Sequence, residues 1–103
     1  MTIYKVINGK RYDTRTAELM TESYNGYNSR DFNWVHEELY RKKTGEYFLA
    51  GEGGPMTGYA EHVGSMRGYG EKIIPLSDDQ ARKWVEDHCS GDEYDRIFIS
   101  CSA

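Results

Sequence analysis

The sequence predicts an α+β fold: a single domain, residues 1–103, with an antiparallel β-sheet of about four to six strands and a C-terminal helix packed on one face. Three observations support this prediction. A chain of 103 residues is long enough for one modest core and too short for two. Strand-like segments separated by turn formers precede residue 77, and a helical periodicity begins only after it. An aromatic content of 14% argues against disorder.

The first predicted element is a β-hairpin around Asn8 and Gly9. Residues 2–7 are rich in β-branched and aromatic side chains, and Asn-Gly accepts positive φ at both central turn positions. Residues 10–12 then form the return strand. For residues 13–19 two alternatives stay open, a brief helical turn or a direct lead into a strand at residues 20–24. A loop with several turn formers follows that strand.

The central prediction is a second hairpin. Polarity alternates over residues 32–41, which predicts a strand. Gly45 can adopt the left-handed conformation that a turn with a bulge requires, and residues 46–50 return. Apolar side chains occur on both faces, so we expect this hairpin at the centre of the sheet. One face of the first strand is predicted to carry Phe32, Trp34, His36, Glu38 and Tyr40, and the opposite face Asn33, Val35, Glu37, Leu39 and Arg41.

Residues 51–70 contain seven of the eleven glycines and predict a long loop, with at most one helical turn at residues 60–63. The glycines from position 51 do not form a phosphate loop. No Lys and hydroxyl residue follow them, and Met56 stands where the third glycine of GxGxxG would fall. A sharp bend is the favoured interpretation. Residues 71–76 resume as a strand, and Pro75 near its end favours a sheet edge or a strand terminus.

The most clearly marked helix begins after Ser77, which has the capping-box spacing to Gln80. Apolar residues then recur at the helical interval and should face the sheet. Ion pairs of Asp78 with Arg82 and of Asp79 with Lys83 are expected along this helix. The same capping spacing at Ser90 predicts a second short helix.

Charge provides the functional prediction. The formal net charge is −4, but residues 1–50 carry eight Lys and Arg against seven Asp and Glu, whereas residues 51–103 carry five against ten. An acidic second half argues against nucleic-acid binding and permits an acidic surface that binds a basic partner. The alternative is a merely solvated helix face. The predicted partner-binding residues are Asp78, Asp79, Glu86, Asp87, Asp92, Glu93 and Asp95 with the exposed aromatics Trp34 and Tyr40.

Catalytic and metal motifs are missing from the sequence. The three histidines show no HExxH spacing and the cysteines no CxxC spacing, so a metal site would have to be assembled from distant segments. Glu37 and Glu38 point to opposite faces of a strand and cannot form an acid pair. A dyad of Cys89 and His36 requires the fold to join them. We therefore expect no enzymatic activity, no catalytic residue, no metal and no cofactor, and a metal- or thiol-dependent enzyme is the remaining alternative.

The sequence also predicts a cytoplasmic location. Two cysteines, Cys89 and Cys101, are too few for a disulfide framework and fit a reducing compartment. Residues 1–7 lack the apolar core of a signal peptide, and no segment approaches the roughly 20 apolar residues of a membrane span.

Several motifs over about residues 7–98 support a resemblance. They are Gly9-Lys10-Arg11-Tyr12-Asp13-Thr14, Tyr40 with Lys43-Thr44-Gly45-Glu46-Tyr47-Phe48, Gly51-Glu52-Gly53-Gly54-Pro55 with Tyr59-Ala60, Gly70-Glu71-Lys72-Ile73-Ile74-Pro75-Leu76, the acidic Trp84 helix, Asp92-Glu93-Tyr94 and Ile97-Phe98. With these motifs the chain resembles small accessory proteins of phages, plasmids and conjugative elements in Gram-positive bacteria.

The resemblance implies a non-enzymatic inhibitor or accessory protein, foremost of the anti-CRISPR type. Its partner would be a CRISPR nuclease or its guide-RNA complex, with no membrane association and no direct DNA binding, and the protein would be a monomer or homodimer. No functional residue follows from the resemblance itself, so the acidic surface is an electrostatic prediction. The alternative is a small-ligand or nucleic-acid binding module that uses the glycine-rich loop, the tyrosines and the basic residues Arg41, Lys42 and Lys43.

Overall fold

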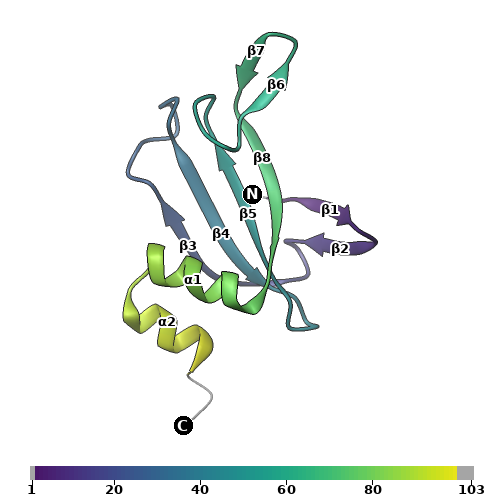
Figure 1. Cartoon of the computed structure of the whole chain (residues 1–103), viewed down its shortest axis with the longest axis vertical. Helices are drawn as coiled ribbons and strands as arrows, with labels where there is room; N and C mark the ends of the chain where they lie inside the picture. Colours follow the sequence, from purple (N-terminus) through teal and green to yellow (C-terminus); the bar gives the residue numbers. More distant parts are fainter. Residues whose placement is uncertain (1, 100–103) are drawn as a thin grey trace.

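The computed structural model describes residues 2–99 and shows an α+β domain (Figure 1), which confirms the predicted fold class. Its centre is a four-stranded antiparallel sheet in the order β3-β4-β5-β8. The strands are β3 (Glu18–Tyr24), β4 (Val35–Arg41), β5 (Tyr47–Gly53) and β8 (Gly70–Leu76). The predicted hairpin therefore supplies the two inner strands, and Pro75 lies on an edge strand, as expected.

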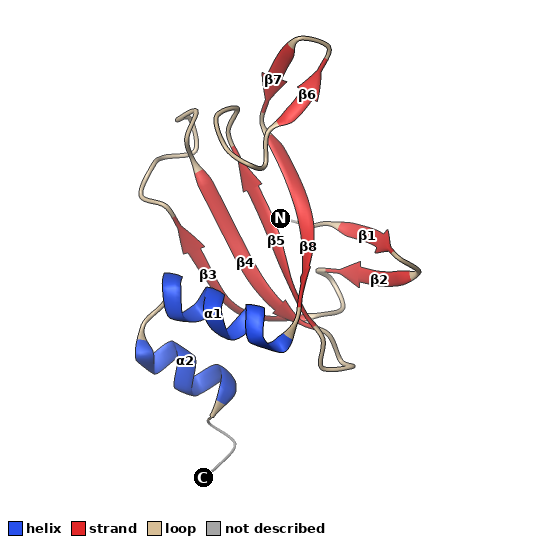
Figure 2. Cartoon of the chain, in the orientation of Figure 1, coloured by secondary structure: helices blue, strands red, loops and turns tan. Residues whose placement is uncertain are grey.

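Two small hairpins and two helices complete the domain. The hairpins are β1 (Tyr4–Ile7) with β2 (Lys10–Asp13), and β6 (Glu61–Val63) with β7 (Met66–Gly68). Helix α1 (Asp78–His88) leads into α2 (Gly91–Phe98). Figure 2 shows both helices at one end of the sheet and the β6–β7 hairpin extending from the opposite end. No helix of the described part of the chain is both long and apolar enough to cross a membrane.

The sheet separates two cores, because alternate residues of its strands face opposite sides. On one side Leu39 and Leu49 pack against Trp84 and Val85 of α1 and Ile97 of α2. On the other side, the adjacent residues of β4 and β5 pack against the β1–β2 hairpin; this second core contains Ile3, Tyr12, Tyr40, Phe48, Ala50 and Ile73. The result is three layers in the order helices, sheet, hairpin.

Local signals predicted most element boundaries. Asn8 and Gly9 have φ values of 53° and 79°, and Gly45 has 94°, as the turn chemistry requires. Ser77 and Gln80 form the full capping box of α1, and the Ser90 side chain accepts a hydrogen bond from Glu93 N at the start of α2.

Several boundaries differ from the sequence prediction, and three of them have a clear structural cause. The chain makes a turn at residues 14–16 and enters β3 at Glu18, two residues before the strand expected at residues 20–24; no helix lies there. Strand β4 begins at Val35 because Asp31 stabilises a turn, accepting hydrogen bonds from Asn33 N at its side chain and from Trp34 N at its carbonyl. The helical turn expected at residues 60–63 is wrong, since β6 lies there in a hairpin inside the predicted loop.

Candidate functional site

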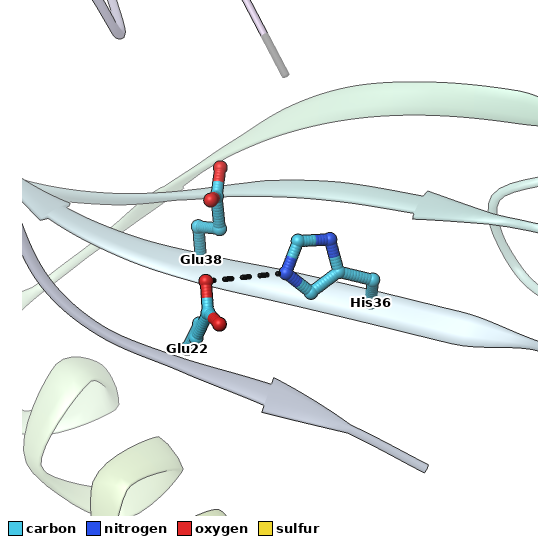
Figure 3. A group of neighbouring side chains, drawn as sticks. All are labelled: Glu22, His36 and Glu38. Atoms are coloured by element: carbon cyan, nitrogen blue, oxygen red, sulfur yellow. Dashed lines mark ion pairs between the residues drawn. The ribbon is translucent and has the colours of Figure 1, made fainter. Parts of the chain in front are cut away.

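Strand β4 positions two polar clusters back to back on the sheet. Glu37 faces the helices, whereas His36 and Glu38 face the opposite side, as the alternation predicted. We call Glu37, Tyr59, Trp84 and His88 the Glu37 cluster. We call Glu22, His36, Glu38 and Glu52 the His36 cluster; Figure 3 shows three of its four members, on strands β3 and β4.

In the Glu37 cluster each carboxylate oxygen accepts a hydrogen bond. Tyr59 donates a short hydrogen bond to Glu37 Oε2, and Trp84 Nε1 donates one to Oε1 over 3.1 Å. His88 Nε2 lies 4.0 Å from Oε1. Burial, followed by the hydrogen bond to Glu37, raises the pKa of the Tyr59 hydroxyl well above its ordinary value. Both carboxylate oxygens thus have neutral donors, which is a structural arrangement.

The sharp bend expected from Gly51 is wrong, because residues 51–53 continue strand β5 and Gly51 does not have a positive φ. Tyr59 lies directly over Gly51, where a Cβ atom would overlap the phenol ring. The ring therefore reaches Glu37 only because position 51 has no side chain. Lys72 Nζ donates to the carbonyl of Gly58 over 2.8 Å and ties the same segment to β8.

In the His36 cluster the partners are incomplete. His36 is 8% exposed, and its Nδ1 lies 3.3 Å from Glu52 Oε2. Its Nε2 lies 3.5 Å from Glu22 Oε2, yet it is buried and makes no hydrogen bond among the described residues. Tyr24 stacks on the imidazole with ring centroids 4.2 Å apart. The imidazole is therefore held rigidly while one nitrogen stays available.

Strand register brings like charges together on this face. Glu22 lies directly opposite Glu38 in the β3–β4 pair, and Glu52 lies opposite Glu71 in the β5–β8 pair. Glu38 is 8% exposed and accepts a hydrogen bond of 3.2 Å from the Tyr40 hydroxyl. Burial, and then the charge of Glu38, raises the pKa of Tyr40 to about 12. Like charges directly opposite one another destabilise a sheet.

The two aromatic residues predicted to bind a partner are not exposed. Trp34 is 8% and Tyr40 6% exposed, so the expectation of exposed aromatics is wrong at both positions. Trp34 stacks between His36 and Tyr69, and Tyr40 stacks on Phe48 within the second core. The alternation expected over residues 32–41 is present from Val35 onward, but the β1–β2 hairpin covers Tyr40, and Tyr69 stacks on Trp34.

The seven predicted acidic residues lie on α1 and α2, and all except the half-buried Glu93 are exposed. Arg82 pairs with Asp78 over 2.8 Å as expected, but Lys83 pairs with Asp87 over 3.0 Å and not with Asp79. Arg96 pairs with Glu93 over 2.6 Å. The ion pairs of residues 2–99 leave four acids of these helices without a basic partner: Asp79, Glu86, Asp92 and Asp95.

A basic groove lies near the turn between β4 and β5. It contains part of the basic cluster that the sequence offered as an alternative binding site. The β1–β2 hairpin brings Arg11, and the turn after it brings Arg15, to Lys42 and Lys43 around an open groove of about 520 Å³. Asp13 pairs with Arg15, and Glu46 accepts hydrogen bonds from Lys10 and Lys42. The bond from Lys10, followed by that from Lys42, lowers the pKa of Glu46 to about 2. The sequence showed only the contiguous part of this patch.

The fold does not join Cys89 with His36. Cys89 packs against the core on the helix side of the sheet, with its Sγ 3.8 Å from Thr21 Oγ1, whereas His36 faces the other side. Burial raises the pKa of the Cys89 thiol, which disfavours the nucleophilic thiolate. Cys101 lies outside the described residues.

The Glu22, His36 and Glu38 group was missed because it joins two strands. A sequence signal for half of it was present, since His36 and Glu38 are two residues apart on one predicted strand and so share a face. Its third member depended on the β3–β4 register.

Comparisons with protein-family models, curated proteins and solved structures find no significant match for this chain.

Proposed function

We propose that this protein is a non-enzymatic inhibitor or accessory protein that binds a basic surface of a partner protein through α1 and α2. One observation carries the proposal: these two helices present seven acids and only three Lys or Arg, and each of those bases is engaged by an acid of its own helix. Four of the seven acids therefore have no ion-pair partner among residues 2–99. Such a face attracts a basic partner over distances near the Debye length, about 8 Å at physiological salt.

The helices are suited to present these charges in a fixed arrangement. Both begin at serine caps, and their apolar sides pack against the sheet through Trp84, Val85 and Ile97. A rigid surface loses less conformational entropy on binding than a mobile one. The Trp34 and Tyr40 rings take no part in this surface, because both are buried.

The partner class follows from the resemblance to accessory proteins of mobile elements. It is a CRISPR nuclease or its guide-RNA complex, and the activity is of the anti-CRISPR type. Surfaces that hold nucleic acid are rich in Lys and Arg because they neutralise phosphates. An acidic helix face matches such a channel in charge.

Binding to purified CRISPR effectors, compared between two sets of variants, tests the proposal. The first set neutralises the four uncompensated acids as Asp79→Asn, Glu86→Gln, Asp92→Asn and Asp95→Asn. The matched control neutralises Asp78, Asp87 and Glu93, whose charges are already paired. We expect the first set to weaken binding roughly 10- to 100-fold, mostly through the association rate, and the control to have a smaller effect.

The salt dependence of affinity provides a second measurement. Raising the salt from 50 to 500 mM should weaken wild-type binding strongly and bring it close to that of the first variant set, because screening removes the same attraction. Unchanged binding in the first set, or salt-independent affinity, would contradict the proposed surface. A failure of all tested effectors to bind would remove the anti-CRISPR assignment and leave the acidic surface to be tested with other basic partners.

A second candidate function is binding of an anionic ligand or nucleic acid in the basic groove. The specific observation is that tertiary structure adds Arg11 and Arg15 to the lysines of the β4–β5 turn. Gel-shift binding of single- and double-stranded oligonucleotides at low salt tests it, with Arg11→Gln combined with Lys43→Gln as the variant. Binding that this variant abolishes would favour the second candidate over the first.

A further inference from the structure

We infer that Glu22, His36 and Glu38 form a binding site for one divalent transition-metal ion, with Zn²⁺ as the first candidate. This site is separate from the acidic helix face and does not depend on the function proposed above. It also departs from the expectation of a metal-free protein, which rested on the absence of a local motif. The inference is carried by the geometry of the ligands, the orientation of the imidazole and the charge of the face.

The three side chains offer a compatible set of ligand atoms. One nitrogen of His36 and one carboxylate oxygen each of Glu22 and Glu38 all lie within 4.8 Å of one another (Figure 3). Imidazole nitrogen and carboxylate oxygen bind Zn²⁺ at about 2.0–2.2 Å, so a bound ion holds its ligands within about 4 Å of each other. The ligand atoms must therefore move closer together when an ion binds. Glu22 can make this movement, because its side chain is 44% exposed. One His and two carboxylates leave a fourth position for water.

The orientation of His36 is that of a metal ligand. A carboxylate only accepts hydrogen bonds, so the contact between Nδ1 and Glu52 over 3.3 Å places the proton of a neutral imidazole on Nδ1. The lone pair is then on Nε2, the buried nitrogen that lacks a hydrogen-bond partner. A carboxylate behind a histidine in this way is the usual second shell of a metal site. Tyr40 orients Glu38 in the same manner through its hydroxyl.

The charge of the face calls for a cation. Glu22, Glu38 and Glu52 surround one imidazole, and their only ion pairs within residues 2–99 are with that imidazole. Glu38 is buried and has none. A buried carboxylate without a cationic partner is costly, and its cross-strand neighbour Glu22 adds repulsion. A divalent ion between Glu22, His36 and Glu38 offsets both costs.

A protonated His36 between Glu22 and Glu52 is the competing explanation. It gives Glu38 no ion pair within 4.0 Å, and the Nε2 contact to Glu22 lacks hydrogen-bond geometry. The Glu37 cluster shows the contrast, because both oxygens of its carboxylate already accept hydrogen bonds from Tyr59 and Trp84. Neutral donors therefore stabilise that carboxylate, whose nearest ion-pair partner among the described residues is His88, 4.0 Å away.

The test titrates Zn²⁺ into the full chain after chelator treatment, with calorimetry for stoichiometry and thermal unfolding for stability. We expect one ion per chain. At a free Zn²⁺ concentration about ten times the dissociation constant, the melting temperature should rise by roughly 5–10 °C. Glu22→Gln and Glu38→Gln should each weaken binding at least tenfold, and Glu52→Gln should weaken it by roughly 10- to 100-fold through the second shell.

Control variants separate this site from adventitious binding. His62→Gln changes an exposed histidine of β6 and Glu86→Gln an exposed acid of α1, and neither should alter Zn²⁺ affinity. Because Glu22 is exposed, Glu22→Gln should keep the fold, which circular dichroism checks. The inference is overturned if wild type binds none of Zn²⁺, Co²⁺ or Mn²⁺, if Glu22→Gln and Glu38→Gln bind like wild type, or if His62→Gln abolishes binding.

Discussion

Glu37 and Glu38 are neighbours on β4, yet the structure surrounds their carboxylates in opposite ways. Glu37 faces the helices and accepts hydrogen bonds from Tyr59 and from the Trp84 indole. Glu38 faces the other side, where it accepts one hydrogen bond from Tyr40 and lies opposite a second glutamate. One carboxylate is satisfied by neutral donors, and the other is crowded by like charge.

The difference shows that the surroundings of an acid decide its role. They decide whether its carboxylate supports the packing or is available to bind a ligand. A buried carboxylate is tolerated when donors fill its acceptor positions, and it then helps to define the packing around it. A buried carboxylate facing another acid and an unpartnered imidazole nitrogen leaves free energy that a bound cation can recover. The Glu37 cluster therefore holds the glycine-rich segment in place, whereas the His36 cluster is where we place a ligand.

We expect the largest effect from a substitution at Gly51 that disrupts the Glu37 cluster. In Gly51→Ala the new methyl group overlaps the Tyr59 ring, which must move and release Glu37. We expect a loss of about 2–4 kcal/mol in the free energy of unfolding, measured by urea denaturation. Gly58→Ala is the control, because its Cβ atom meets nothing within 4 Å, and it should change stability by less than about 0.5 kcal/mol. Equal effects at the two positions would show that Tyr59 does not depend on close approach.

The second prediction compares the two carboxylates with the same isosteric change, in the presence of a chelator. Glu37→Gln presents an amide NH₂ to one of its two donors, so we expect a loss of about 1–3 kcal/mol in the free energy of unfolding. Glu38→Gln keeps an acceptor for Tyr40 and removes the repulsion with Glu22, so we expect a gain of about 0.2–1 kcal/mol. A loss of stability in both variants would mean that the surroundings of Glu38 stabilise its carboxylate as well as those of Glu37 do.

The smallest expected effect concerns Tyr40, which reports on the His36 side at high pH. Its folded pKa of about 12 exceeds the unfolded value near 10, so the unfolded state loses this proton first as the pH rises. This contribution to stability is complete below pH 10 and declines from there toward pH 12. Denaturation at successive pH values should show a shallower decline in Tyr40→Phe than in wild type.

Glu38→Gln refines the same measurement. It should lower the pKa of Tyr40 only in part, because burial is the larger cause of the rise and persists in the variant. Difference absorbance of the tyrosinate, with Tyr40→Phe as the blank, follows this ionisation directly. A return of Tyr40 to its ordinary pKa in Glu38→Gln would instead make Glu38 the dominant cause.

Local chemistry predicted much of the fold from the sequence. The turn at Asn8 and Gly9, the left-handed Gly45 and the cap at Ser77 each depend on residues close in sequence, and each is present. The segment after Gly51 was harder to predict because β6 and β7 are three residues each. Strands that short show no clear alternation, and the surrounding glycines conceal them.

The candidate sites divide in the same way. The acids of α1 and α2 could be located from the sequence, since helical spacing and caps define an exposed face. Their pairing could not be, because Lys83 can reach an acid four residues before or after it, and it pairs with Asp87. The exposure of Trp34 and Tyr40 was mispredicted, because alternation identifies a shared face but not what covers it.

By itself the sequence determined the α+β class, the central hairpin, the two capped helices and the acidic C-terminal half, because these follow from spacing and charge along the chain. Only the tertiary structure decided which side chains from distant segments of the chain come into contact. The β3–β4 register sets Glu22 beside Glu38, and the space above Gly51 admits Tyr59 to Glu37. The physical reason is that contacts between strands depend on register and packing of distant segments, which no local periodicity encodes.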